Sequence, residues 1–364
     1  REKNGEETFG DAETVISEKK ALEVKSFFDR YRSFLIISHV QPDGDAISSS
    51  LSLSFGLRRL GKETQTAIDW PIPEVFQSIP LCDQIRGYPI DNGFDAVVFV
   101  DGSSPDRMGR FAKLLDEKPS CIIDHHRSAL SFGTMQWVEP TASATAQLIL
   151  LLNKLLEVPY DPILATLNLL GLQTDSGFFR YSNTTADLFR DAAFLMEHGA
   201  QPYFNASTIL ENKKTEEFHL LTRMIEKIEV LLSGKLVYSY ITQEMLLASE
   251  CAEEDTAGFI GELRSIKGTE CAILFVESET GDTRVSFRSK KWFDVSQVAV
   301  HFGGGGHLKA SGCSLRGDFF KNIDTVVRFV ERKMTESTAS DAILNLLSDR
   351  GQRNTLADSG QNEK

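Results

Sequence analysis

The sequence contains no hydrophobic run that approaches the roughly 20 residues needed to span a bilayer, and its first residues form no apolar signal-peptide core. No C-x-x-C pair occurs among its five cysteines, Cys82, Cys121, Cys251, Cys271 and Cys313. An odd, unpatterned set of cysteines in a chain of this size is typical of a reducing compartment. The sequence therefore predicts a cytoplasmic protein with no membrane partner.

Positive charge is also scarce. Lysine and arginine total 39 against 52 aspartates and glutamates, which gives a formal charge of −13. Proteins that coat long nucleic acid do so by neutralising phosphates, so this balance argues against that class. A small anionic substrate held by a few cations is still compatible with it. The 364 residues, 41% hydrophobic and 25% charged, are ordinary for a globular protein with two cores.

In the first half of the chain, short apolar runs alternate with helical patterns. Four apolar or β-branched runs predict strands: 34–40, 63–69, 94–100 and 120–123. Three longer segments predict helices: 46–61, 144–156 and 162–173. Strands that alternate with helices favour a mostly parallel sheet with helices on both faces, so we predict an α/β fold.

Beyond residue 205 the sequence becomes more charged and its pattern changes. The stretch 206–230 is charged and helical, and we interpret it as a connector between domains. Alternating runs at 235–241, 270–278 and 283–289 then predict strands, with a helix at 257–266, which indicates a smaller α/β domain with a mixed sheet. The predicted parts are a disordered arm (1–20), a first domain (21–205), the connector (206–230), a second domain (231–335) and a tail (336–364).

Acidic and histidine residues follow four of the apolar runs, in SHVQPDGD, VVFVDGSS, CIIDHHRS and LQTDSGFF. Imidazole mixed with carboxylate suits divalent manganese, iron, cobalt or zinc better than magnesium or calcium. Several of these residues follow predicted strands, and ligands of open α/β sheets bind beyond the carboxyl ends of the strands. They can therefore converge, although 86 positions separate His39 from His125. The candidate metal ligands are His39, Asp43, Asp45, Asp101, His125 and Asp175.

The charge of this set indicates two metal ions. Its four aspartates sum to −4, which two divalent cations would balance. Without cations, four carboxylates in one place would repel each other and raise each other's pKa values. Each motif alone is weak, because an aspartate at a strand end often caps a turn. Together the motifs predict a binuclear site and metal-assisted hydrolysis.

A second candidate site lies in HFGGGGHLKASGC (301–313). Successive glycines let backbone N–H groups approach an anion without interference from Cβ atoms. The window 284–321 holds seven lysines and arginines against two aspartates, a formal charge of +5 in an acidic chain. We therefore predict a phosphate clamp, in which Arg288 is the leading cation. Trp292 and Phe293 either stack on a base or belong to the core.

Taken in order, the motifs SHVQPDGD, FVDGSS, IIDHH, TDSGFFRYSNTT, VSFRS and FGGGGHLKASGC resemble those of DHH phosphoesterases with a DHH-associated C-terminal domain. The resemblance runs from about residue 21 to 333 and is greatest to the nanoRNase type. Within that type it is greatest to phosphodiesterases that act on 5′-pApA, the linear product of cyclic di-AMP. The usual A-A-G-C after the glycines is Ala310-Ser311-Gly312-Cys313 here, a mild departure.

The resemblance implies manganese as the metal and a homodimer as the assembly. One ion would be held by His39, Asp43 and Asp101, and the other by Asp45, Asp101, His125 and Asp175. The remaining catalytic candidates would be His126, facing the scissile phosphate, and Asp124, orienting a histidine. The far end of the substrate would be held by residues of the second domain: Ser286, Arg288, Gly304, Gly305, Gly306, His307 and Lys309.

We therefore predict a manganese-dependent phosphodiesterase, or 3′–5′ oligoribonuclease, that degrades pApA and very short RNA to mononucleotides. Removal of the 3′-phosphate from pAp is an alternative that needs the same metals and the same clamp. A nucleotide sensor without turnover is an alternative of another class. A degenerate site would have lost ligands, however, and every expected ligand is present.

Overall fold

The computed structural model describes residues 16, 18–90 and 93–336, and the chain divides into two compact units between Asn212 and Lys213. The predicted tail, and most of the predicted arm, lie outside the described residues. Helix α1 (Glu18–Arg30) begins inside the range predicted as an arm. A membrane-spanning helix is absent from the described part of the chain.

The first unit is built on a parallel sheet with the strand order β2-β1-β3-β4-β5. Its strands are β1 (Ser33–Ile37), β2 (Glu63–Ala67), β3 (Ala96–Val100), β4 (Ser120–Asp124) and β5 (Met135–Val138). The first four correspond to the predicted runs, whereas β5 is not among the predicted strands. Strand β1 ends at Ile37, so Ser38 and His39 already lie beyond the sheet.

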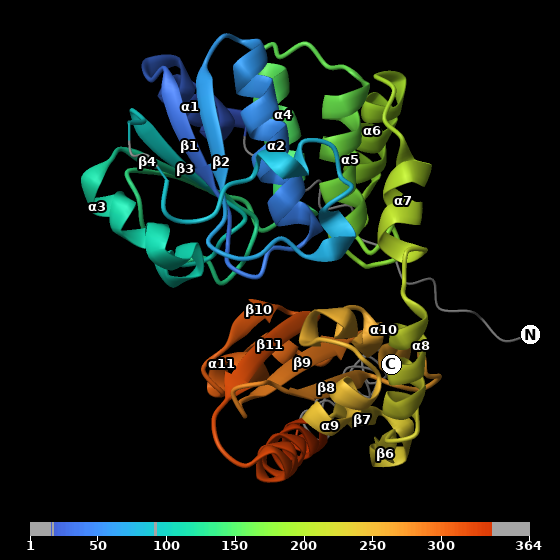
Figure 1. The fold of residues 1–364 in the computed structure, drawn as a ribbon. Helices are drawn as coiled ribbons and strands as arrows, with labels where there is room; N and C mark the ends of the chain where they lie inside the picture. The colour runs from blue at the N-terminus through green and yellow to red at the C-terminus, as the bar shows by residue number, and fades with distance from the viewer. Residues whose placement is uncertain (1–15, 17, 91–92, 337–364) are drawn as a thin grey trace, which may run out of the picture. The chain divides into compact units, whose positions relative to one another are not determined.

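Helices cover both faces of this sheet, as the sequence predicts (Figure 1). Successive side chains of a strand point to opposite faces. In β1, Phe34 and Ile36 pack with α1, α2 (Gly44–Arg59) and α4 (Thr145–Leu155). Leu35 and Ile37 pack on the other face with η3 (Pro105–Lys113) and α3 (Leu114–Glu117). All of these strand residues are fully buried, so the sheet is the centre of the first core.

Helix α2 approaches α5 (Pro162–Asp175) unusually closely because both helices carry small residues. Five serines of α2 are buried: Ser48, Ser49, Ser50, Ser52 and Ser54. A Cβ atom on Gly171 of α5 would lie 2.7 Å from Ser48 Oγ. Ser48 Oγ instead donates to Leu167 O and accepts from Gly171 N. Helices α6 (Ala186–Glu197) and α7 (Pro202–Leu210) complete the unit.

The second unit contains a six-stranded mixed sheet with the order β10-β11-β9-β8-β7-β6. Its strands are β6 (Glu229–Leu231), β7 (Leu236–Ile241), β8 (Cys271–Glu277), β9 (Thr283–Ser289), β10 (Gly305–His307) and β11 (Ala310–Leu315). Only β7 and β8 pair in parallel. One face packs on α8 (Thr215–Ile225), α9 (Gln243–Ala248) and α10 (Phe259–Ser265), and the other on α11 (Val295–His301) and the helix over 319–336.

The stretch 206–230, which the sequence predicts as a helical connector, holds the end of α7, all of α8 and the start of β6. Helix α8 has its own N-terminal cap, because Glu217 Oε1 accepts from the backbone N–H of Lys214. Leu220 and Met224 of α8 are buried against β7 and belong to the second core. Most of the predicted connector is therefore part of the second unit.

Candidate metal centre

The candidate ligands of the first unit gather at the carboxyl ends of three neighbouring parallel strands. His39 follows β1, Asp101 follows β3 directly, and His125 follows β4 directly. Asp101 has a positive φ of 59° and its backbone N–H donates to Ile123 O, so the chain turns sharply where the strand ends. Aspartate tolerates this left-handed conformation better than most residues.

One cluster consists of His39, Asp43 and Asp101. His39 Nε2 lies 3.6 Å from Asp101 Oδ2 and 3.9 Å from Asp43 Oδ1. Asp43 caps α2, because its Oδ1 accepts from the backbone N–H of Ala46 at 3.0 Å. One potential ligand atom from each residue lies within 4.8 Å of the others, which is close enough for a shared cation.

The tautomer of the His39 ring determines whether its Nε2 atom has a lone pair to offer a metal ion. Nδ1 lies 2.8 Å from Val40 O and 2.9 Å from Arg107 Nη2. A proton on Nδ1 donates to Val40 O, whereas the guanidinium has only donors and can bond to Nδ1 only in the other tautomer. With the proton on Nδ1, the lone pair of Nε2 faces the carboxylates, which is the state that a metal ligand requires.

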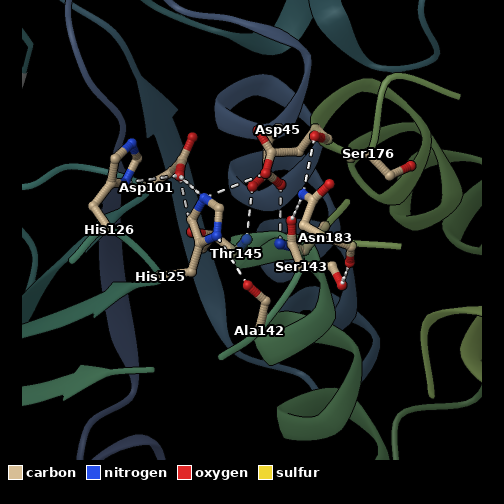
Figure 2. A network of polar contacts seen from close by, with 12 residues as sticks. Asp45, Asp101, His125, His126, Ala142, Ser143, Thr145, Ser176 and Asn183 are labelled. Atoms are coloured by element: carbon tan, nitrogen blue, oxygen red, sulfur yellow. Dashed lines mark hydrogen bonds and ion pairs between the residues drawn. The ribbon is translucent and has the colours of Figure 1, made fainter. Parts of the chain in front are cut away.

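A second cluster consists of Asp45, His125 and Asp175. His125 Nε2 lies 3.5 Å from Asp175 Oδ2 and 3.8 Å from Asp101 Oδ1. His125 Nδ1 lies 3.2 Å from Ala142 O, so a proton on Nδ1 donates there and leaves the Nε2 lone pair toward the acids (Figure 2). Asp101 thus faces His39 with one oxygen and His125 with the other.

Backbone N–H groups at the start of helix α4 hold the Asp45 carboxylate in place. Its Oδ2 accepts from the backbone N–H of Thr145 at 2.6 Å (Figure 2). Its Oδ1 accepts from the backbone N–H of Ala146 at 2.9 Å. Ser49 Oγ donates to the same Oδ1 at 3.0 Å. Burial, and then the negative charges of Asp101 and Asp175, raise the pKa of Asp45 well above its usual range. Its carboxylate is therefore costly to keep ionised without a nearby cation.

The pKa of Asp101 shifts in the opposite direction. Burial opposes its ionisation, but the neighbouring imidazoles of His39, His126 and His125 lower the pKa below its usual range. Asp101 is 2% exposed, and Thr145 Oγ1 donates to its Oδ1 at 2.9 Å. Within the described residues, neither Asp45 nor Asp101 pairs with a lysine or an arginine.

His126 lies beside this pair of clusters and belongs to a third, with Asp101 and Asp124. Its Nδ1 donates to Asp124 Oδ1 at 2.7 Å and lies 3.7 Å from Asp101 Oδ1. Burial opposes its protonation, yet the hydrogen bond to Asp124 and the surrounding carboxylates raise the pKa of His126 to about 10. Its side chain is 22% exposed, and it lies at the edge of the acidic clusters.

Asp124 is fully buried and organises the turn that follows β4. Its Oδ1 accepts from the backbone N–H groups of His125 and His126 as well as from the His126 ring. Its Oδ2 is buried and has no hydrogen-bond partner among the described residues. This geometry agrees with a residue that orients a histidine, the part that the family resemblance implies for Asp124.

Three residues of this site are absent from the sequence-based prediction: Ser143, Thr145 and Asn183. Asn183 Nδ2 donates to Ser143 O at 3.0 Å and to Asp175 O at 3.1 Å, and Ser143 Oγ donates back to Asn183 O. The turn between Asp175 and Asn183 has positive φ at Gly177, Phe178 and Phe179. These bonds link the backbone of Asp175, through Asn183, to the segment that precedes α4. Serine, threonine and asparagine are common in turns, so the sequence offers no signal that singles them out.

This donor set fits a pair of divalent ions. The four predicted aspartate ligands and the imidazoles of His39 and His125 form two clusters, and Asp101 of the first lies 3.8 Å from His125 Nε2 of the second. Mixed nitrogen and oxygen donors suit manganese, iron, cobalt or zinc. The six predicted ligands thus come together with His126 and Asp124 in one place, whereas the predicted phosphate clamp lies in the other unit.

In the second unit, the glycine motif is an ordered strand pairing rather than a flexible linker. Strand β10 pairs with β11, which pairs with β9, so that His307, Ala310 and Arg288 lie in one row across the sheet. A Cβ atom on Gly304 would lie 2.1 Å from Gly312 O, and one on Gly306 would lie 2.6 Å from Ala310 O. Glycine is therefore required at both positions by the close approach of the backbone.

The polar side chains of β9 face away from the core that contains Phe287. Ser286 and Arg288 alternate with Val285 and Phe287, which are buried against α11 and the helix over 319–336. Arg288 Nη1 donates to Phe287 O at 2.9 Å. Lys309 lies in the turn between β10 and β11, and its Nζ donates to Lys291 O. The predicted clamp residues therefore share neighbouring strands and the turn between them.

Comparison with known proteins gives the same two parts. The family description "DHH family, N-terminal domain" matches residues 33–172, and "DHHA1 domain" matches residues 233–336. A Thermus thermophilus protein named bifunctional oligoribonuclease and PAP phosphatase NrnA is 31% identical over 307 residues, 83% of this chain and 90% of that protein.

Two solved structures are similar in fold. An exopolyphosphatase-related protein from Bacteroides fragilis has a TM-score of 0.80 at 22% identity and covers 88% of this chain and 97% of its own. RecJ from Thermus thermophilus, solved in complex with Mn²⁺, has a TM-score of 0.50 at 13% identity and covers 89% of this chain and 56% of its own. Both likenesses support the α/β architecture described above.

Proposed function

This chain belongs to the DHH family, and from that premise we propose that it is a metal-dependent phosphodiesterase that hydrolyses very short oligoribonucleotides to mononucleotides. The observation that carries the proposal is the pair of clusters at the ends of β1, β3 and β4, between which Asp101 faces His39 with one oxygen and His125 with the other. Such paired sites, when they hold two cations, catalyse displacement at phosphorus. The name of the Thermus relative supports an oligonucleotide as the substrate.

We assign the metal ligands as the sequence predicts. His39, Asp43 and Asp101 would hold one ion, and Asp45, Asp101, His125 and Asp175 the other. Manganese is our choice of metal, since a structure of similar fold was solved with it and the donor set suits it. Two divalent ions, when bound, stabilise the negative charge that develops on the phosphoryl oxygens during hydrolysis.

The residues around the ions would position the substrate and donate a proton to the scissile phosphate. The Nδ1–H of His126 donates to Asp124 Oδ1. The Nε2–H of the protonated ring would then be available to donate to an oxygen of the scissile phosphate. In this proposal the first domain, residues 21–205, carries catalysis. The second domain, residues 231–335, binds the far phosphates and nucleosides through Arg288, Ser286, His307, Lys309 and the glycines 304–306.

A second activity, removal of the 3′-phosphate from pAp, is favoured by the second half of the relative's name, "PAP phosphatase". The same metal site would serve both reactions, because each cleaves an ester bond at phosphorus. Comparing initial rates on pApA and on pAp with the purified, manganese-loaded protein separates them. Turnover of pApA would also support a function after cyclic di-AMP is linearised.

The test of the main proposal is a substrate panel read by chromatography of the products. We expect pApA and a five-residue RNA to yield mononucleotides, and a fifty-residue RNA to be degraded at least tenfold more slowly. Equal rates on the two RNA lengths would contradict the short-substrate proposal. Asp101→Ala should abolish turnover, whereas Asp324→Asn, an exposed position on the helix over 319–336 of the other unit, should leave it unchanged.

If Asp101→Ala leaves the measured hydrolysis rate unchanged, that hydrolysis does not come from the proposed site. The alternative, a nucleotide sensor without turnover, would then be favoured. The homodimer that the family resemblance implies is also part of the proposal. Sedimentation of the purified protein at micromolar concentration tests it, with a mass near twice 40.6 kDa as the expected result.

A further inference from the structure

Thr145 contacts both of the carboxylates that lie deepest in the metal centre. It is the first residue of α4 and is fully buried. Its backbone N–H donates to Asp45 Oδ2 at 2.6 Å, and its side-chain Oγ1 donates to Asp101 Oδ1 at 2.9 Å (Figure 2). Asp45 comes from the start of α2 and Asp101 from the end of β3, so one residue ties together two distant parts of the chain.

The hydroxyl contact constrains the rotation of the Asp101 carboxylate. The terminal torsion of an aspartate is broad and only weakly restrained by sterics. In the structure, Asp101 Oδ2 faces His39 Nε2 and Oδ1 faces His125 Nε2. A hydrogen bond from Thr145 to Oδ1 favours this orientation, in which each oxygen serves one of the two clusters.

Threonine suits the task of fixing the Asp101 carboxylate better than serine. Its β-branched side chain has few accessible χ1 rotamers in a helix, so the hydroxyl is held in place before any ligand arrives. The backbone N–H groups of Thr145 and Ala146 are fixed by the helix start, where the partial positive charge favours a carboxylate. The hydroxyl and the amide of Thr145 thus form one rigid donor pair.

We propose that Thr145 is a positioning residue that holds the Asp101 carboxylate in the orientation needed to bridge two metal ions. This inference rests on the proposed metal-dependent function and adds to it a residue that touches neither the ions nor the substrate. A threonine that merely filled the core would be replaceable by valine, which has the same shape. A positioning threonine would be replaceable by serine, which keeps the hydroxyl.

The experiment measures manganese binding directly, through the electron paramagnetic resonance signal of free Mn²⁺ during titration of the metal-depleted full chain. The variants are Thr145→Val, Thr145→Ser and, in case valine prevents folding, Thr145→Ala. We expect the wild type to bind two ions. The valine and alanine variants should bind at least one of them about 10–100-fold more weakly, and serine should restore affinity to within a few-fold. Unfolding temperatures without metal identify any variant that has lost its fold.

Kinetics at saturating manganese give a second result. Thr145→Val should lower kcat with little change in KM, since substrate contacts are untouched. Two wild-type-like binding events in Thr145→Val would overturn the inference, and so would equal losses in the serine and valine variants. A wild type that binds no manganese would instead overturn the proposed metal centre, and this inference with it.

Discussion

Asp45 and His126 each make the stability of the protein without bound metal depend on pH. Burial and two neighbouring carboxylates raise the pKa of Asp45, and the hydrogen bond to Asp124 raises that of His126 to about 10 despite burial. Each group therefore keeps a proton in the folded state that it loses in the unfolded state. The contribution of His126 is complete below about pH 6.5 and is lost as the pH rises to about 10. That of Asp45 falls in the same direction from about pH 4 upward.

We therefore expect the chelated protein to lose stability between pH 6.5 and pH 9, by up to about 1.4 kcal/mol per pH unit from His126. Urea unfolding in the presence of EDTA measures this slope. A chelated protein whose stability is constant or rises over this range would contradict the raised pKa of His126.

At the same scale, residue types and spacing predicted which side chains would gather, but not how they are held. The structure brings His39, Asp43, Asp45, Asp101, His125 and Asp175 together, and their role as ligands stays a prediction. The carbonyl of Ala142 and the amide of Thr145 also form the site. Backbone groups carry no residue signature, so only the folded chain reveals them.

At the scale of elements, the close packing of α5 on α2 and α4 fixes the position of Asp45 in the metal centre. A Cβ atom on Gly171 would lie 2.7 Å from Asp45 Oδ1 and 2.5 Å from Ala146 Cβ. Gly171→Ala should therefore displace Asp45 and destabilise the fold by about 1–3 kcal/mol. We expect kcat to fall by up to about 100-fold, because small displacements of catalytic groups are costly.

Gly261 provides the matched control. It also lies in a helix, α10, and a Cβ atom there would meet nothing within 4 Å. Gly261→Ala should leave kcat unchanged and stabilise the protein by about 0.5–1 kcal/mol, since alanine restricts the unfolded chain. Urea unfolding and steady-state rates of both variants make the comparison. Similar losses in the two would show that close packing at Gly171 is not the cause.

Elements with strong local patterns could be predicted from the sequence, and those decided by distant contacts could not. The apolar runs of β1, β3 and β4 read as buried strands because all of their residues point into one core or the other. Strand β10 is Gly305-Gly306-His307, and no propensity favours a strand there. It forms because the glycines let its backbone approach β11.

At the scale of the whole molecule, the two units divide the proposed work between metals and substrate. Arg288 is on β9 of the second unit, so its loss should weaken substrate binding and leave metal binding intact. We expect Arg288→Ala to lower kcat/KM about 10–100-fold, mainly through KM, because one charge-assisted hydrogen bond to phosphate is lost. Titration with Mn²⁺ should give the wild-type result.

Arg328 is the control for lost charge. It is exposed on the helix over 319–336, where it pairs with Asp324, and lies outside the predicted clamp. Arg328→Ala should leave kcat/KM within about twofold of the wild type. Equal effects of the two substitutions would mean that Arg288 acts only through the net charge of an acidic chain. Reduced manganese binding in Arg288→Ala would contradict the division of work between the units.

The central claim is that six side chains of the first unit hold two cations through a shared Asp101. The most direct measurement is an anomalous difference map from a crystal of the full chain grown with Mn²⁺. The account predicts two peaks, one beside His39 and Asp43 and one beside Asp45, His125 and Asp175, with Asp101 contacting both. A single peak, or none among these residues, would contradict it.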